Sequence, residues 1–350
     1  MPSNHAVLSA SSSARWIACP PSALINARAN DTTSVYAQQG TDAHSLSEHK
    51  LKDTLAMDTV DPRHTLKYLD EEMEDCTDAY VQYVQEQMSY LDNPRVLIEQ
   101  RLDFSKWVDD GFGTGDCVLA DDTNLIVIDL KYGLGVQVEA KDNTQLMCYG
   151  LGALALYPDV QNITLCIFQP RRHHISTHTL LKDKLLKWAD ETLSPAAKLA
   201  SQGKGDFSSG EHCRFCAIKA TCRSRAEESL KMAVYEFEQP INLDTYEIED
   251  ILLKADGLIR WVSDVKDYAL EQALAGHEWR NFCLGEARSI RKYTDEQVVA
   301  DTVLALGKNP YSQKLLGITD MTKLLGKQQF NEHLSGLVYK PQGKEILVRR

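Results

Sequence analysis

The fold class of this 350-residue chain is decided by three neighbouring segments: RVLIEQRLDF (95–104), GTGDCVLAD (113–121) and NLIVIDLKYG (124–133). Each is short, rich in β-branched residues and bounded by turn residues, which predicts a three-stranded meander whose third strand is apolar enough to be central. The segment 144–157 predicts a helix that ends before Pro158, residues 162–172 predict a fourth strand, and HHISTHTL (173–180) predicts a return strand. This order predicts an α/β core with a mixed central sheet flanked by helices.

Helices are predicted on both sides of these strands. Apolar residues recur every three or four positions over 66–91, which indicates an amphipathic helix. Further helices are expected around 20–29, from a start within GTDAHSLSEHKL (40–51), over 181–200, over 243–275, and after a capping box at 294–297. Extended ends are expected around 281–290 and 337–349. We therefore expect a first domain at 1–228 and a mainly helical C-terminal region at 229–350.

Composition narrows the function classes. No apolar run approaches the ~20 residues that a membrane span needs, and the N-terminus lacks the pattern of a secretion signal, so we expect a cytoplasmic protein with no membrane partner. The 38 basic and 50 acidic residues give a net charge of −12. Thirteen acids lie within 41–92, however, and 171–188 and 213–225 are locally basic. Because a polyanion responds to a local patch, charge leaves DNA binding open.

Two acids and one lysine on adjacent predicted strands could carry chemistry. Asp116 lies in GTGD, while Asp129 and Lys131 end the third strand in IDLKYG. Adjacent antiparallel strands would bring the two carboxylates together, where hard oxygen ligands suit Mg²⁺ or Mn²⁺. The two-residue step from Asp129 places Lys131 on the same sheet face, where an ammonium can orient water or stabilise charge on a phosphate. An isolated D-x-K is more often only a charged pair at a strand end.

Four further residues strengthen this hypothesis. His44, in GTDAH, can supply an imidazole ligand, and Glu99 is an acid in the first strand that needs a partner if it is half-buried. Gln145 and Tyr149 are spaced i, i+4 and share a helix face just after the third strand. Each residue alone is more often structural or ordinary polar surface, so the set counts only as an ordered whole.

The cysteines form a second constellation. Cys213, Cys216 and Cys222 lie close together among basic residues, a pattern that favours thiolates and metal binding. Cys19 is the candidate for a fourth ligand, and His212 is an alternative that would complete a Cys₃His zinc site. Spacing alone leaves Zn²⁺ and a [4Fe–4S] cluster both open. Joining residue 19 to 213–222 would enclose the whole predicted α/β core.

The ordered set resembles the RecB-type branch of the PD-(D/E)xK nuclease superfamily. The cysteine pattern is similar to that of its iron–sulfur members, which include the AddB nuclease domain and the CRISPR-associated RecB-like exonuclease. The chain as a whole resembles phage and prophage RecB-like proteins of unknown function. Gly115 stands where the superfamily's name has a proline, a difference that RecB-like members often share.

The resemblance implies a restriction-endonuclease-like core and roles for individual residues. It implies that Mg²⁺ or Mn²⁺ is bound by His44, Asp116, Asp129 and the Leu130 carbonyl. It implies that catalysis also uses Lys131, Gln145 and Tyr149, with Lys131 as the catalytic lysine. It implies that a [4Fe–4S] cluster is held by Cys19, Cys213, Cys216 and Cys222.

The function expected from this resemblance is metal-dependent hydrolysis of DNA phosphodiester bonds. The family context implies an exonuclease that prepares single-stranded or duplex ends for phage recombination, together with a phage single-strand annealing protein. The alternative is a non-catalytic DNA-binding or recombination accessory protein on the same scaffold. The chain has no P-loop pattern G-x-x-x-x-G-K-[ST], which argues against a built-in ATP-driven motor.

Overall fold

The computed structural model describes residues 6–29, 34–231, 243–287, 293–312, 314–339 and 341. Contacts between Cα atoms divide the chain into two compact units, Met1–Tyr268 and Ala269–Arg350. The first unit contains all five named strands. The predicted domain boundary after residue 228 stays a prediction.

The described elements follow one another in an α/β order. The helices and strands of the first unit are α1 (Ser13–Ala18), α2 (Ser22–Ala27), α3 (Val35–Thr54), α4 (Glu71–Met88), β1 (Arg95–Asp103), β2 (Phe112–Ala120), β3 (Asn124–Leu130), α5 (Thr144–Leu156), β4 (Asn162–Gln169), β5 (His174–Leu181), α6 (Lys182–Trp188), α7 (Ser194–Ser201) and α8 (Arg223–Leu230). Short 3-10 turns cover Ala10–Ser12, Pro170–Arg172 and Glu211–Phe215. Helix α9 (Thr245–Leu274) crosses the boundary between the units, and the second unit holds α10 (Glu296–Ala305), α11 (Ile318–Leu334) and a 3-10 turn at Ser335–Leu337.

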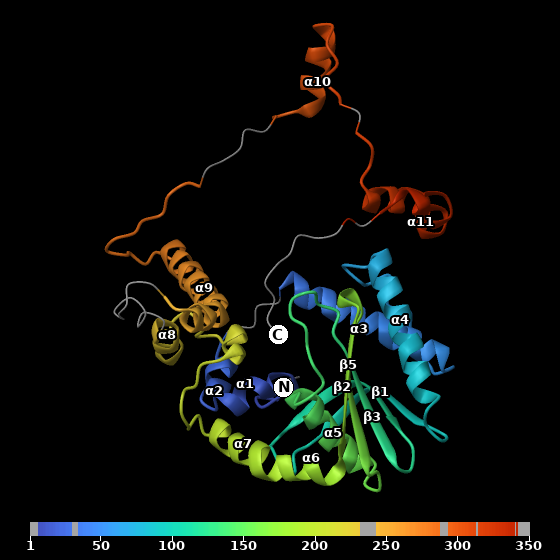
Figure 1. Cartoon of the computed structure of the whole chain (residues 1–350), viewed down its shortest axis with the longest axis vertical. Coiled ribbons are helices and arrows are strands. Elements are labelled where there is room, and N and C mark those ends of the chain that lie inside the picture. Colours follow the sequence, from blue (N-terminus) through green and yellow to red (C-terminus); the bar gives the residue numbers. More distant parts are fainter. Residues whose placement is uncertain are drawn as a thin grey trace. The chain divides into compact units, whose positions relative to one another are not determined.

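The sheet is mixed, as predicted, and its spatial order β1-β2-β3-β4-β5 follows the sequence. Figure 1 shows the strands between α5 on one side and α4 on the other. Strands β1, β2 and β3 pair antiparallel, β3 and β4 pair parallel, and β4 and β5 pair antiparallel. The parallel pair requires a crossover, which α5 supplies. β3 is therefore central, and six of its seven residues are buried, which explains its nearly continuous apolar sequence.

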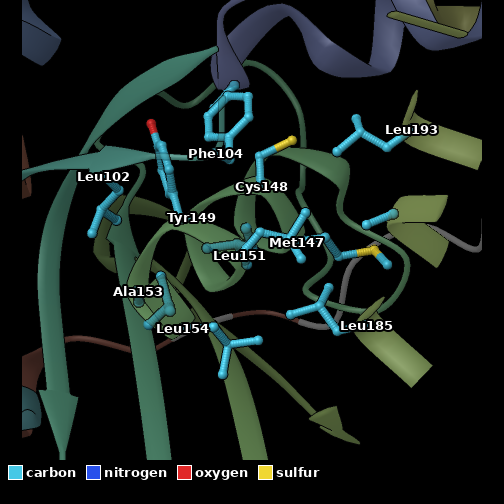
Figure 2. Close-up of a cluster of buried hydrophobic side chains, with 14 of the residues drawn as sticks. Leu102, Phe104, Met147, Cys148, Tyr149, Leu151, Ala153, Leu154, Leu185 and Leu193 are labelled. Atoms are coloured by element: carbon cyan, nitrogen blue, oxygen red, sulfur yellow. The ribbon is translucent and has the colours of Figure 1, made fainter. Parts of the chain in front are cut away.

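Helices cover both faces of the sheet and create two hydrophobic cores. On one face, α5, α6 and α7 pack against alternate strand residues such as Val118, Val127 and Leu165. Figure 2 shows part of this core, where side chains of α5 lie between Leu102 on one side and Leu185 and Leu193 on the other. On the opposite face, α3 and α4 pack against the strand residues of opposite parity.

Several helix boundaries differ from the predictions. Helix α3 begins at Val35, because the Ser34 side chain accepts a hydrogen bond from the Ala37 N–H, so GTDAH lies inside the helix and not at its start. The helix predicted over 66–91 begins only at Glu71, after the capping side chain of Asp70. The helix predicted over 181–200 is divided into α6 and α7 by a wider π-helical turn at Ala189–Leu193.

The predicted C-terminal helices are present. Helix α9 matches the prediction for 243–275, and α10 begins one residue later than expected because Asp295 is the capping residue. The described parts of 281–290 and 337–349 contain no strand, and residues 288–290, 340 and 342–349 lie outside the described residues. No helix in the described part of the chain is long and apolar enough to span a membrane.

Candidate active site and cysteine site

The register between β2 and β3 brings Asp116 and Asp129 to adjacent positions. Cys117 pairs with Ile128, so the two acids each lie one residue beyond the last pair of this antiparallel ladder. The Leu130 N–H donates a 2.6 Å hydrogen bond to Asp116 Oδ2, which fixes this carboxylate against the end of β3. The expected side-by-side arrangement of the two strand ends is therefore present.

A local reversal of the strand pattern turns Glu99 toward the same side. Leu97 and Leu102 both pack against the core that contains α5, although residues five apart in a regular strand point to opposite faces. Glu99 lies between them with a φ of 47°, the left-handed region that non-glycine residues rarely adopt. Strained backbone of this kind concentrates at functional sites. This reversal places Glu99 beside Asp116 and the His44 side chain of α3.

His44, Glu99 and Asp116 form a compact group of candidate ligands, which we call the acid cluster. One ligand atom from each of the three lies within 4.8 Å of the other two. His44 Nδ1 is 3.2 Å from Asp116 Oδ1. Two carboxylates and one imidazole in this space suit a divalent cation with hard oxygen ligands.

Protonation in the acid cluster follows from burial and from the close charges. Burial disfavours the charged imidazole, but the charge of Asp116, its hydrogen bond and the charge of Asp129 together raise the pKa of His44 to about 9. Burial and the Asp116 charge raise the pKa of Glu99 to about 7. Burial opposes ionisation of Asp116, yet His44, Lys131 and the Leu130 N–H hold its pKa below the usual value. The cluster thus holds both acids close together with one compensating imidazolium.

Asp129 belongs to a second, adjoining group with Lys131, Gln145 and Tyr149. Asp129 Oδ2 is 2.7 Å from Lys131 Nζ, and Asp129 Oδ1 accepts a 3.0 Å hydrogen bond from Gln145 Nε2. Lys131 Nζ donates to Gln145 Oε1 at 3.1 Å, and Gln145 Nε2 also donates to the Tyr149 hydroxyl at 3.0 Å. Burial disfavours the ammonium, but Asp129 outweighs burial and raises the pKa of Lys131. Lys131 is therefore a charged donor in this arrangement.

Helix α5 positions the amide and the phenol. The Asn143 side chain caps α5 by accepting from the Leu146 N–H, so Gln145 lies in the first turn, where it reaches the end of β3. The ring of Tyr149 packs within the hydrophobic core, and its hydroxyl oxygen lies on the side of that core nearest the strands (Figure 2). Gly113 permits this approach, because a Cβ atom there would lie 2.7 Å from Tyr149 Cε1.

The donor set of the acid cluster fits a hard divalent cation. Its three ligand atoms come from separate elements, α3, β1 and β2, and Asp129 provides a further carboxylate nearby. Asp129 is 2% exposed, and its Oδ2 atom receives no well-oriented hydrogen bond despite its proximity to Lys131. Such a carboxylate oxygen retains capacity to accept another donor or a cation. Among the described residues, the three ligand atoms that lie within 4.8 Å of one another include one from Glu99 but none from Asp129.

The four predicted cysteine ligands line one cavity, which we call the cysteine cavity. Cys19 comes from the end of α1, and Cys213, Cys216 and Cys222 come from the segment before α8. The space among these side chains measures about 320 Å³ when the open solvent at its mouth is included. Hydrogen bonds join its two walls: Arg15 donates to the Phe215 carbonyl oxygen, Ser208 donates to that of Ala18, and the Ala217 N–H donates to the Asn26 side chain.

Two buried donors without partners line the cysteine cavity. Within the part of the chain that the structure describes, Ser22 Oγ and Arg15 Nε have no hydrogen-bond partner, although both atoms are fully shielded. Unsatisfied buried polar atoms are rare, so their presence here fits a bound group that carries acceptor atoms. Within the described residues, no three thiol sulfurs lie within 4.8 Å of one another. His212, the alternative fourth ligand, donates from Nε2 to the Ser208 carbonyl oxygen at 3.0 Å.

Every candidate residue named from the sequence lies at one of these two sites, but the sequence did not fully predict which of them group together. Glu99 was set apart from the predicted metal ligands, and nothing in its sequence context indicates a left-handed backbone. Tyr80 fits the apolar spacing of α4, and Arg15 and Ser22 carry no motif, so no sequence signal distinguishes these three residues. The basic residues near the cysteines were noted, and Lys219 and Arg225 pair with Asp264 of α9 at 2.8 and 2.6 Å.

Comparison with known proteins places the chain in a family but supplies no activity. A solved structure described as "Crystal structure of SSO0001" aligns with 58% of this chain and 93% of its own length, at 11% sequence identity. Its TM-score of 0.25 is too low to carry a structural argument. A family model described as "Protein of unknown function (DUF2800)" matches residues 5–350. Because that match spans nearly the whole sequence, the chain belongs to the DUF2800 family.

Proposed function

We propose that this protein is a Mg²⁺- or Mn²⁺-dependent DNA nuclease of the RecB-like PD-(D/E)xK type. The observation that carries the proposal is the adjacency of two groups at the ends of β2 and β3. The acid cluster gathers His44, Glu99 and Asp116 within 4.8 Å. Lys131, which is partly buried and bridged to Asp129 and Gln145, adjoins it as a charged donor. Cation ligands next to a positioned ammonium suit an anionic substrate that gains charge during reaction.

Each side chain has a role that follows from its contacts. His44, Glu99 and Asp116 would hold the cation, with Asp129 as an additional carboxylate. A divalent cation bound there would offset the negative charge of the phosphodiester and favour attack by water. Lys131 donates a hydrogen bond from Nζ to a phosphate oxygen, because its raised pKa keeps it protonated beside Asp129. Gln145 holds both Asp129 and Lys131, so it orients the ammonium, and Tyr149 in turn orients Gln145.

The cysteine cavity favours a [4Fe–4S] cluster over Zn²⁺. A tetrahedral zinc with Zn–S bonds of about 2.3 Å would draw its sulfurs to about 3.8 Å from one another. Among the described residues, no three thiols lie within 4.8 Å of one another, so the thiols are more widely spaced. A larger cluster also brings sulfide acceptors, which suit the unpaired donors Ser22 Oγ and Arg15 Nε. The proposed cluster stabilises the fold, because it would join α1 to the segment before α8.

The biological setting proposed for this nuclease is the processing of DNA ends in phage recombination. Exonuclease action on single-stranded or duplex ends, with a single-strand annealing protein as partner, follows from the resemblance to RecB-like phage proteins. The locally basic segment that contains Arg171 and Arg172 supplies charge for a polyanion, although Arg171 is itself paired with Glu72 at 2.9 Å. A cytoplasmic location is part of this proposal.

A cleavage assay with end-labelled DNA tests the proposal. Purified protein is incubated with single- and double-stranded DNA, labelled at the 5′ or the 3′ end, in Mg²⁺, Mn²⁺ or EDTA. We expect cation-dependent cleavage, a loss of at least about a hundredfold in Asp116→Asn, and full activity in Asp122→Asn. Asp122 is the matched control, because it is 99% exposed at the opposite end of the same hairpin. Cleavage that persists in EDTA or in Asp116→Asn refutes the proposal, and DNA binding without cleavage favours an accessory protein instead.

A further inference from the structure

Tyr80 presents an unpaired hydroxyl close to the acid cluster. It lies on α4, is 2% exposed, and packs with Cys117, Ile128 and Leu130, which neighbour Asp116 and Asp129 along β2 and β3. Its ring meets the edge of Phe168 with centroids 5.8 Å apart. Its hydroxyl oxygen is fully shielded and has no hydrogen-bond partner among the described residues.

The surroundings of this hydroxyl are acidic. Burial raises the pKa of Tyr80 well above its usual value, and Cys117 and then Asp116, Asp129 and Glu99 raise it further. The phenol is therefore always protonated and can donate a hydrogen bond. A buried hydroxyl without a partner destabilises the folded state, and a phenylalanine at the same place would avoid that cost. Packing alone does not explain a tyrosine here.

We propose that Tyr80 is a positioning residue of the acid cluster, whose hydroxyl holds a water molecule retained by a divalent cation bound to His44, Glu99 and Asp116. Mg²⁺ gives up its waters reluctantly and usually keeps several when it binds to carboxylates. Groups that hydrogen-bond such ligands from outside change cation affinity by about 10- to 100-fold when they are removed. This inference rests on the cation site of the proposed function, but not on DNA cleavage.

Tyr83 supplies a matched control on the same helix. It is also buried, at 8% exposed, and stacks on the same Phe168 ring with centroids 5.1 Å apart. Its hydroxyl interacts with Cys166 and not with the acid cluster. Tyr83→Phe therefore removes one hydroxyl from the same core without changing the surroundings of the cation site.

Thermal unfolding of the full chain, titrated with Mn²⁺ or Mg²⁺ after removal of cations by EDTA, tests the proposal. We expect cation to raise the Tm of the wild type. Tyr80→Phe should match or exceed the wild-type Tm without cation, yet need at least about tenfold more Mn²⁺ for half of the cation-induced shift. Tyr83→Phe should need the same Mn²⁺ concentration as the wild type. A role in packing alone would change the Tm without cation and leave the titration midpoint in place.

The outcomes separate this inference from the proposed function. If the wild type responds to Mn²⁺ and Tyr80→Phe has the same midpoint, the inference about Tyr80 is overturned while the cation site stands. If both tyrosine variants shift the midpoint equally, the effect is a general one of the core and the inference is also overturned. If the wild type responds to neither cation, the cation site and the role of Tyr80 both fail. A cation response without DNA cleavage overturns the nuclease proposal alone.

Discussion

The ion pair between Asp129 and Lys131 allows a quantitative test of how the candidate active site is held together. Asp129→Asn keeps an oxygen that can accept from Gln145 Nε2, so it removes the charge with little change of shape. It leaves the Lys131 ammonium beside an uncharged amide, 2.7 Å from where the carboxylate oxygen was. We expect the variant to fold, to be less stable without cation, and to lose cleavage.

The size of the effect follows from burial. Removing one partner of a buried ion pair costs about 3–5 kcal/mol. The Lys131 side chain is 29% exposed, so water compensates for part of the lost charge, while loss of the repulsion between Asp129 and Asp116 compensates for more. We therefore expect the free energy of unfolding to fall by about 2 kcal/mol. Lys131→Met alone should also cost about 2 kcal/mol, because it leaves the Asp129 carboxylate without its cation. The double variant should cost little more than either single variant, since no unpaired charge remains, which gives a coupling energy of about 2 kcal/mol.

Urea unfolding in EDTA at pH 7, followed by circular dichroism, measures these differences for both single variants and the double variant. Asp122→Asn is the control, because an exposed carboxylate paired with Arg95 contributes about 0–1 kcal/mol. The reasoning is refuted if Asp129→Asn unfolds at the wild-type urea concentration and the double variant shows additive changes.

Three further predictions concern the surroundings of the two sites. A carboxyl pKa raised to about 7 in Glu99 means that the folded state binds this proton more tightly than the unfolded state. Stability present below about pH 4.5 is then lost as pH rises through about 7. In EDTA, the free energy of unfolding of the wild type should therefore fall by up to about 3 kcal/mol more than that of Glu99→Gln over this range. Equal pH dependence of unfolding in the two proteins would contradict this. Gly113→Ala should lower stability by about 1–3 kcal/mol and reduce cleavage, because its Cβ would lie 2.7 Å from Tyr149 Cε1; unchanged urea unfolding and activity would contradict the packing described. Cys213→Ala should remove broad visible absorption and lower the Tm, while Cys283→Ala, at an exposed thiol, should do neither; a colourless wild type would instead indicate zinc or no cluster.

The sheet could be predicted from sequence because its signals are local. Segments such as 124–130 are too apolar and β-branched for any place but the centre of a sheet, and the helix at 144–156 supplies the crossover that a parallel pair needs. The two-residue step from Asp129 to Lys131 predicted only that both side chains lie on the same side of the sheet, and both contact Gln145 of α5. The meander of the first three strands and the mixed sheet are confirmed.

What sequence could not predict depends on backbone conformation and on contacts between distant segments. The left-handed φ of Glu99 reverses the side-chain pattern of β1, and alternation rules assume that no such reversal occurs. Tyr80 occupies an apolar position in the spacing of α4, like its hydrophobic neighbours, so only the surroundings of its unpaired hydroxyl in the folded protein distinguish it. The nuclease assignment and both cofactors stay predictions until they are tested.

The cysteine cavity also sets the order of events during biosynthesis. One wall comes from residues near Cys19 and the other from 207–225, so a ribosome must make the whole sheet before the second wall emerges. Until then the first helices lack the partners to which Arg15 and Asn26 bond. Nascent chains halted before Cys213 would therefore leave the Cys19 thiol without the second wall of the cavity, and we expect cellular proteases to degrade such fragments more readily than the finished protein.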